Sequence, residues 1–491
     1  MRKADFWKGD WLLGLVVSLA VLAAGSGSLL QSLERKAYDL GMGMASRTPS
    51  DRIAVIAIDK TSIDNIGRWP WSRDVHAEMI DRLAGAGAKV VATTIFFSEP
   101  QVDPGLVFIN KLIGQYGEAG GLPLSSADQD LSAQEGLLGP MSLTLKEAEA
   151  ALSTDRRLAE AVGHAGNVVL PVLFHRGQPL GHPEGAAPDY LARNAIAATG
   201  DEYRLLAADG LVASVLPALG AGVAALGDLN ILPDVDGAIR SVPLAMDYYG
   251  QAYPALALQI VRQALNLKAA DLQVDRGDRV RAGRLSVTTD AASQMYPFYY
   301  ADRDGRAPFP VDSFYDVRSG KIPLDKYRDK IVLIGPTDPG TAKMHTTPVS
   351  VQTPDVLMLA HWVSSILSEH YFVVPEWGTL AERLVLLAVA LYLIFILPRL
   401  RAATGAALTA LLLVTLVGSH FFLMVEKSLW LQLMVPATLL LLGHLLLTTK
   451  HFLVTEKGKE KSELDSAEPN RILALAFQGQ GQLDMAFDKF R

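Results

Sequence analysis

The sequence lacks cysteine altogether, and this absence removes several kinds of chemistry. None of the 491 residues can form a disulfide, act as a thiol nucleophile or bind a metal through a cysteine thiolate. A domain without thiols also suits an oxidising compartment, because it cannot form wrong disulfides there. A basic excess is missing as well. The net charge of −7 argues against nucleic acid as a partner, since phosphate binding needs a basic surface.

Recognisable catalytic and metal-binding motifs are also missing. No serine lies in a nucleophile elbow, and the scattered histidines do not have the spacing of a metal site. The stretch from Gly335 to Lys343 is no phosphate loop, because its lysine does not directly follow the second glycine. Asp234 to Gly237 is interpreted as a turn rather than a calcium loop, which needs more oxygen ligands. The sequence therefore predicts no catalytic residue, no metal and no cofactor.

Long apolar runs, in contrast, are present. Charged residues make up 20% of the chain but are unevenly spread. A helix needs about 20 predominantly apolar residues to cross a bilayer. Four segments are predicted to be such spans: 11–30, 379–397, 402–425 and 429–449.

Basic residues set the predicted orientation of these spans. Arg2, Lys3 and Lys8 precede the first, and Arg399 and Arg401 lie between the second and third. Lysines also follow the last span, so the positive-inside tendency places residues 1–10 and the C-terminal tail in the cytoplasm. A cleaved signal peptide is the alternative for the first span, because small residues follow its apolar run. Both interpretations place residues 31–376 outside the cytoplasm. We expect a multi-pass protein of the bacterial inner membrane with a periplasmic domain.

The exported segment has the pattern of an α/β domain. Strands are predicted at 53–58, 90–97 and 167–173, and helices at 72–83 and 155–162 lie between them. This alternation favours a mainly parallel sheet with helices on both faces. A second group of predicted elements comprises a helix at 253–265, a strand at 330–335 and a helix at 356–367. The Gly-, Ser- and Ala-rich residues 101–154 are interpreted as a surface insertion, partly helical at 143–152.

Two tryptophans before the first helix are the candidates for ligand binding. Trp69 and Trp71 carry a large apolar area, and the default interpretation is that they pack against the edge of the sheet. The alternative is a ligand cage that they form with Asp59 and Arg73. This alternative is kept open because the four residues follow the first strand at its carboxyl end, where open α/β sheets place ligands.

Several motifs occur in the same order as in a known family. They are Ile58–Ser62, Ile66–Arg73, His76, Ala86–Val91, Phe97–Pro100, Asp234–Leu244, Gly320–Ile322 and Lys330–Gly335. Together they resemble the second-class CHASE domain, an extracellular sensor domain first named for its association with cyclases and histidine kinases. The resemblance spans most of residues 31–375 and implies a sensor followed by three membrane spans.

The chain departs from the family pattern at three places. The family has an aspartate where this sequence has Thr94, and another at the position of Lys343. A Gly-Val-Glu-Ile-His run is replaced by residues 355–359. Because polar positions change, these departures favour a mechanical or assembly role over ligand sensing at the family's usual surface.

The tail after the last span is predicted to be helical. Residues 450–468 form a charged linker, and residues 469–491 resemble part of a tetratricopeptide repeat. The packing positions of that repeat are Leu473, Ala474, Phe477, Ala486 and Phe490. One repeat cannot bury its own face, so we expect either a longer natural chain or a neighbour supplied by oligomerisation. The tail also resembles the stretch that follows the last span in bacterial second-class CHASE proteins with serine/threonine kinase domains.

These features predict the sensing and membrane-spanning part of a bacterial signal receptor. The expected output is a serine/threonine kinase, which would lie beyond Arg491 because its motifs do not occur here. The expected partners are the lipid bilayer, further copies of the chain, an unidentified periplasmic signal and cytoplasmic proteins. The alternative is an oligomeric membrane scaffold that assembles through its exported domain and recruits partners through repeats.

Overall fold

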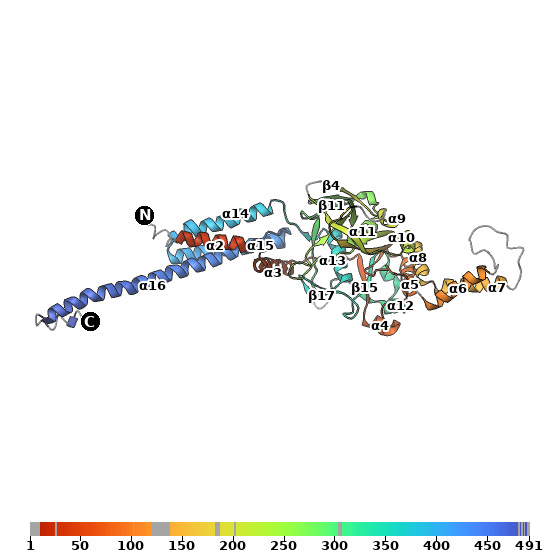
Figure 1. Ribbon diagram of the computed structural model, residues 1–491, viewed down its shortest axis with the longest axis horizontal. Helices are drawn as coiled ribbons and strands as arrows, with labels where there is room; N and C mark the ends of the chain where they lie inside the picture. Colours follow the sequence, from red (N-terminus) through yellow and green to blue (C-terminus); the bar gives the residue numbers. More distant parts are fainter. Residues whose placement is uncertain are drawn as a thin grey trace. The chain divides into compact units, whose positions relative to one another are not determined.

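The computed structural model describes residues 10–24, 27–101, 103–118, 138–181, 187–200, 203–302 and 307–479, with residues 482, 485, 487 and 488. The chain separates into two compact units (Figure 1). Asp39–Val374 form an α/β unit, whereas Met1–Tyr38 and Pro375–Arg491 form a helical unit.

A nine-stranded sheet is the centre of the α/β unit. Its order is β14-β1-β15-β2-β3-β5-β8-β9, and β6 also pairs with β3. The strands are β14 (Val311–Ser313), β1 (Ile53–Ile58), β15 (Ile331–Pro336), β2 (Val90–Thr93), β3 (Val168–Arg176), β5 (Leu206–Ala213), β8 (Ala245–Tyr248), β9 (Gln251–Pro254) and β6 (Ala225–Asp228). Neighbours from β14 to β3 are parallel, as are β3 with β6 and β5 with β8. The ladders β3–β5 and β8–β9 are antiparallel. The sheet is therefore mixed, and the predicted parallel pairing holds for the part from β14 to β3.

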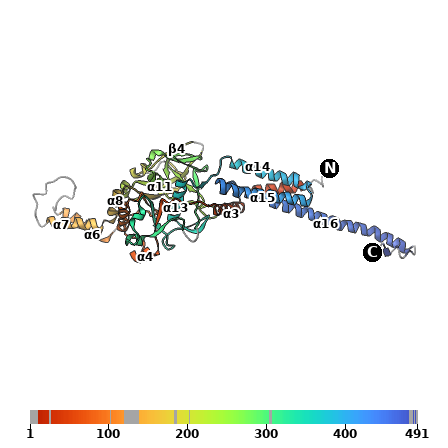
Figure 2. The same ribbon diagram turned by 180° about the vertical axis from the view of Figure 1, so that it is seen from behind.

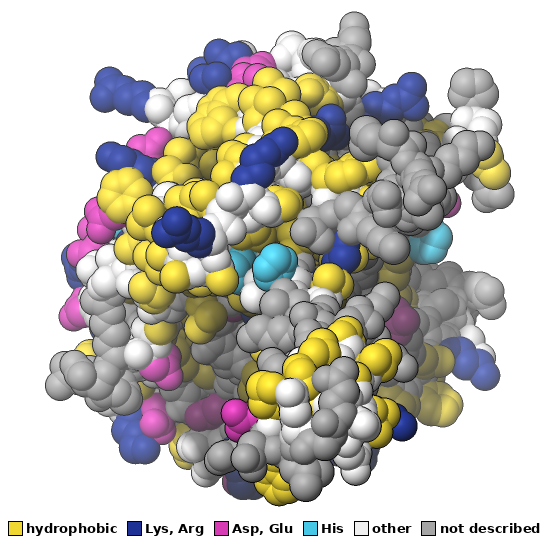
Figure 3. Space-filling view, turned by 90° about the vertical axis from the view of Figure 1, so that its left-hand side faces the viewer, with side chains coloured by type: hydrophobic (Ala, Val, Ile, Leu, Met, Phe, Trp, Pro, Cys, Tyr) yellow, Lys and Arg dark blue, Asp and Glu magenta, His cyan; other side chains and the backbone are white. Residues whose placement is uncertain are grey.

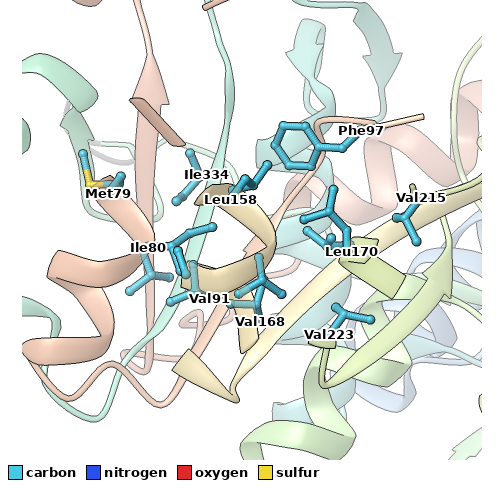
Figure 4. Close-up of a cluster of buried hydrophobic side chains, with 14 of the residues drawn as sticks. Met79, Ile80, Val91, Phe97, Leu158, Val168, Leu170, Val215, Val223 and Ile334 are labelled. Carbon is cyan, nitrogen blue, oxygen red and sulfur yellow. The ribbon is translucent and has the colours of Figure 1, made fainter. Parts of the chain in front are cut away.

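Helices cover both faces of the parallel half. β1 and β15 are almost wholly apolar and buried, as expected for strands covered on both sides. Alternate side chains such as Ile56 and Ile334 join a core cluster with α5 (Arg73–Gly85) and α8 (Thr154–Ala165) (Figure 4). The other face contacts α11 (Leu256–Ala264) and α13 (Asp355–Ser368). Because strand side chains alternate between faces, one apolar run supplies both cores.

Most predicted elements of this unit are present with shifted ends. The strand predicted at 90–97 ends at Thr93. The helix predicted from 253 begins later, as α11 (Leu256–Ala264), because Gln251–Pro254 pair with β8 instead. Within the predicted insertion, α6 (Pro104–Glu118) and α7 (Leu138–Leu152) lie side by side, apart from the body of the sheet (Figures 1 and 2). Residues 119–137 lie outside the described part of the chain.

Smaller elements complete the α/β unit. The helices are α4 (Lys60–Ile66), α9 (Asp189–Ala192), α10 (Pro217–Gly222) and α12 (Phe314–Arg318). A four-stranded sheet has the order β12 (Leu285–Thr288), β11 (Arg279–Ala282), β10 (Leu272–Asp275) and β4 (Ala197–Thr199). The order of a three-stranded sheet is β18 (Tyr371–Phe372), β13 (Gln294–Pro297) and β7 (Val242–Pro243). A two-stranded sheet joins β16 (Met344–Thr347) to β17 (Ser350–Pro354).

Among its described residues, the helical unit contains three helical segments long and apolar enough to cross a membrane. They are Gly378–Arg399, Ala402–Lys427 and Met434–Val454. The first comprises α14 (Gly378–Leu391), a π-helical turn (Tyr392–Ile396) and a 3-10 turn (Leu397–Arg399). The second is α15 (Ala402–Lys427), and the third is the start of α16 (Met434–Gly479).

The prediction of one unbroken helix over residues 11–30 differs from the structure. Helix α2 (Asp10–Ala24) has 15 residues, and its apolar part, Trp11–Ala23, is shorter than the other three. A separate amphipathic helix, α3 (Ser28–Met44), follows it. The small polar and glycine residues at 25–28 disfavour a continuous helix.

The last apolar helix also starts later than predicted. The chain leaves α15 through Ser428, which has a positive φ of 54°, and residues 429–433 are not helical. The N–H of Met434, the first residue of α16, is bound at 2.9 Å by the buried carboxylate of Glu34 from α3. A carboxylate at a helix N-terminus is favourable, because free N–H groups and the helix dipole meet it there. The start at Met434 is therefore capped by a residue 400 positions away in the chain.

Large apolar side chains are exposed along these helices. They include Leu384, Leu387, Leu411, Val414, Phe422, Leu441 and Leu445. Yellow hydrophobic side chains and dark-blue Lys and Arg side chains are both visible in Figure 3. An apolar surface of this extent is typical of helices surrounded by lipid.

Helix α16 continues through the predicted linker 450–468 and ends at Gly479. Ala474 is buried, whereas Leu473 is exposed. Ala486 and Phe490 lie outside the described residues, so the tetratricopeptide repeat stays a prediction.

Candidate ligand cavity and buried arginine cluster

A cavity of about 370 Å³ lies at the carboxyl ends of β2 and β15 in the α/β unit. Its volume is in the range of small-molecule sites. Its polar and charged lining comes from Arg73, His76, Thr94, Ser98, Glu99, Thr341, Lys343 and Asp355. The apolar lining consists of Trp69, Pro70, Ile95, Phe96, Pro336 and Ala342. This is the edge at which open parallel sheets bind ligands, because loops from several strands converge there.

Arg73 is held at the cavity by contacts on three sides. Its guanidinium lies 4.7 Å from the ring centroid of Phe97, and Nη2 donates to the carbonyl oxygen of Glu99 at 3.2 Å. Its Nε lies 3.4 Å from a carboxylate oxygen of Asp155. Gln101 accepts a hydrogen bond from the backbone N–H of Arg73 at 2.8 Å and so fixes the start of α5. The arginine is therefore ordered before any ligand arrives.

His76 lies one helical turn after Arg73 and is surrounded by aromatic rings. The ring centroids of Trp69 and Phe97 are 5.7 Å and 5.4 Å from that of His76. Burial, together with the positive charge of Arg73, lowers the pKa of His76 to about 3, so the imidazole is neutral at physiological pH. Among the described residues, neither Nε2 of His76 nor Oγ1 of Thr94 has a hydrogen-bond partner. Both atoms are buried, and buried polar atoms are normally paired, so these two are unusual features of the cavity's surroundings.

The opposite wall follows β15. Asp338 shapes its loop by accepting the N–H groups of Thr341 and Ala342 at its carbonyl oxygen, at 2.9 Å and 2.8 Å. The exposed side chain of Lys343 follows. Asp355, the first residue of α13, lies 2.8 Å from Nε2 of His345. The wall thus brings one amine and one carboxylate to the cavity.

Among known protein families, the CHASE2 domain family matches residues 13–395. The chain belongs to the CHASE2 family. Comparisons with curated proteins and with solved structures found no match. With the three apolar helical segments, this membership describes a membrane protein with an exported sensor domain, as a transmembrane signal receptor requires.

The CHASE2 domain brings two of the four predicted ligand residues to the cavity. Trp69 and Arg73 line it. Trp71 instead is buried, donates from Nε1 to the carbonyl oxygen of Gly67 at 2.8 Å and packs against Phe314. Asp59 caps α4 by accepting the N–H of Ser62 at 2.9 Å. The packing interpretation thus describes Trp71, and Trp69 remains a candidate for ligand contact.

The departures from the family pattern also meet at this cavity. Thr94, Lys343 and Asp355 all line it, although they are far apart in sequence. Their convergence leaves a polar cavity in place, so the substitutions alone do not favour a mechanical role over ligand binding. The sequence signal for this wall is that the resembled family has an aspartate at the position of Thr94, which follows β2 directly.

A second polar cluster of the CHASE2 domain surrounds Arg240 and was not predicted. The buried guanidinium makes bidentate hydrogen bonds to Asp39 at 2.8 Å and 2.7 Å. It also bonds both oxygens of Asp236 at 2.9 Å and one oxygen of Asp234 at 3.1 Å. Burial alone would lower the pKa of Arg240, but the carboxylates outweigh it and raise the pKa. Asp236 and Asp234 of the predicted turn therefore bind Arg240, which follows them by four and six residues.

That turn itself is present. The N–H of Gly237 binds the carbonyl oxygen of Asp234 at 2.9 Å, and Gly237 has the positive φ of 84° that glycine adopts without strain. Within the described residues, no group of three histidines and carboxylates could hold a metal ion.

Proposed function

We propose that this CHASE2 protein is a transmembrane receptor that binds a small-molecule signal in the cavity at the carboxyl ends of β2 and β15. The observation that carries the proposal is the polar and charged lining of that cavity, to which Arg73, Glu99, Lys343 and Asp355 contribute. Nε2 of His76 and Oγ1 of Thr94 are buried beside it without a protein partner, which costs about 1–3 kcal/mol each.

Helix α3 is the proposed path from the sensor domain to the membrane. It carries Asp39, which binds Arg240 in the α/β unit, and Glu34, which caps α16 in the helical unit. A ligand acts only through the difference in its affinity for two states, so two arrangements of α3 are part of the proposal. The output is proposed to be a serine/threonine kinase joined to the tail, supported by the resemblance described for that segment.

The orientation of the chain tests the receptor most directly. Because cysteine is absent, a single introduced cysteine is a unique reporter. Val235 and Gln478 are both exposed and suit Val235→Cys and Gln478→Cys. In intact cells an impermeant thiol reagent is expected to label Val235→Cys only. Labelling of both sites, or of neither after both are shown to react in lysed cells, would contradict the proposal.

Transmission is tested on the full chain in lipid nanodiscs. A library of amino acids, sugars, nucleotides and organic acids is screened for compounds that raise the unfolding temperature. We expect at least one to slow deuterium exchange in the loops after β2 and β15 and to change exchange in α16. If every stabilising compound leaves α16 unchanged and the oligomeric state stays constant, the scaffold alternative replaces the receptor.

A further inference from the structure

The charges that line the cavity identify the class of its ligand. Two basic side chains, Arg73 and Lys343, and two acidic ones, Glu99 and Asp355, face the same space. A ligand with only negative charge would meet both carboxylates, and a ligand with only positive charge would meet both cations. Like charges brought together at a binding site are unfavourable, so neither ligand matches this lining.

Resting on the proposed function, we propose that the cavity binds a small zwitterion with an apolar side chain, of the α-amino acid type. Its carboxylate is bound by Lys343 and Arg73, and its ammonium group by Glu99 and Asp355. Lys343 has no ion pair in the described structure, whereas Arg73 shares its charge with Asp155 at 3.4 Å. Lys343 is therefore the cation with most to gain from a ligand carboxylate.

The apolar part of the ligand has its own surface. Trp69, Pro70, Ile95 and Phe96 form a wall beside the charged groups. Trp69 is only half-buried, and its ring is held edge-on to Trp71 at 5.2 Å. A rigid aromatic surface next to a few oriented polar groups is the usual composition of a small-molecule site. A ligand side chain on this wall would remove further apolar area of Trp69 from water.

Three probes with one carbon skeleton test the charge requirement. L-Phenylalanine carries both charges, 3-phenylpropanoate only the carboxylate, and 2-phenylethylamine only the ammonium group. Binding to the full chain in nanodiscs is measured by isothermal titration calorimetry. We expect L-phenylalanine to bind at least about tenfold more tightly than either analogue, because each analogue leaves charged groups of the wall unpaired.

Two variants assign the charges to their ends of the ligand. Lys343→Met is expected to weaken L-phenylalanine about tenfold and to strengthen 2-phenylethylamine, because a like charge is removed. Glu99→Gln is expected to weaken L-phenylalanine and, for the same reason, to strengthen 3-phenylpropanoate. Both positions are exposed, so both variants are expected to fold, and thermal unfolding checks this. Lys60→Met and Glu147→Gln change exposed charges that do not line the cavity and are the matched controls.

The zwitterion assignment fails if either analogue binds as tightly as L-phenylalanine, or if none of the three binds. It also fails if L-phenylalanine binds equally well to Lys343→Met and Glu99→Gln. The receptor proposal is judged separately, by the labelling of Val235→Cys and the exchange of α16. A different compound that alters α16 while these probes fail would preserve the receptor and remove only this ligand class.

Discussion

Two polar clusters of the α/β unit differ in how completely their groups are paired. Around Arg240, one buried guanidinium meets three carboxylates through five hydrogen bonds of 2.7 to 3.1 Å. Around the cavity, Nε2 of His76 and Oγ1 of Thr94 have no partner in the described structure. The first arrangement closes a contact within the fold, and the second leaves two buried polar atoms beside the cavity without a partner. Charge and burial alone do not distinguish a structural cluster from a binding site, whereas the pairing of each polar atom does.

The largest loss of stability is expected when Arg240 is replaced. Arg240→Met leaves the carboxylates of Asp39, Asp234 and Asp236 together without their cation, and we expect a loss of about 3–5 kcal/mol in the free energy of unfolding. Chemical denaturation of the full chain measures it. Arg279→Met breaks an exposed pair with Asp278 and should cost less than about 1 kcal/mol. Equal losses in the two variants would refute the structural role of the Arg240 cluster.

The second test concerns the unpaired histidine. Because the pKa of His76 is about 3 when folded and 6.5 when unfolded, protons bind preferentially to the unfolded chain between these values. Stability is therefore lost as the pH falls below 6.5. His76→Phe removes this pH dependence. The free energy of unfolding of the variant, relative to that of the native chain, should therefore rise by about 2 kcal/mol between pH 7 and pH 5.

His164 provides the control for that measurement. It is an exposed histidine near the end of α8, so His164→Phe makes the same substitution away from the buried aromatic cluster. If His76→Phe does no more than His164→Phe, the imidazole of His76 is not held neutral by burial.

A smaller effect is expected at Asp59, which separates a cap from a ligand contact. Asp59→Ala removes the acceptor for the N–H of Ser62 and should cost about 1 kcal/mol in the free energy of unfolding. The affinity for any ligand found in the cavity should not change, because Asp59 does not line it. A loss of affinity without a loss of stability would instead restore the four-residue cage.

The smallest effect on stability is expected at Lys343. Its side chain is exposed, so Lys343→Met should change the free energy of unfolding by no more than about 0.5 kcal/mol. Weaker ligand binding by this variant would mean that Lys343 serves the ligand and not the fold. A substantial loss of stability would mean that Lys343 belongs to the fold, as Arg240 does.

Local patterns in the sequence determined the existence and type of many elements. The apolar run Ile53–Ile58 predicted β1, and three long apolar segments predicted helices that could cross a membrane. Such features depend on residues that are neighbours in the chain, so hydrophobicity and periodicity reveal them. The separation of α2 from α3 and the start of α16 at Met434 were not predicted, because hydrophobicity marks a run but not its helical ends.

The contacts between polar groups depend on the tertiary structure. Asp39 and Arg240 are 201 residues apart, and the walls of the cavity come from the separate loops after β2 and β15. Trp69 and Arg73 could be proposed for the site because they follow β1, whereas Lys343 and Asp355 joined it through the pairing of β15 between β1 and β2. Strand order depends on contacts between distant segments, and no local pattern records it. The same reason explains why the aspartates near Gly237 predicted a turn but not the arginine they bind.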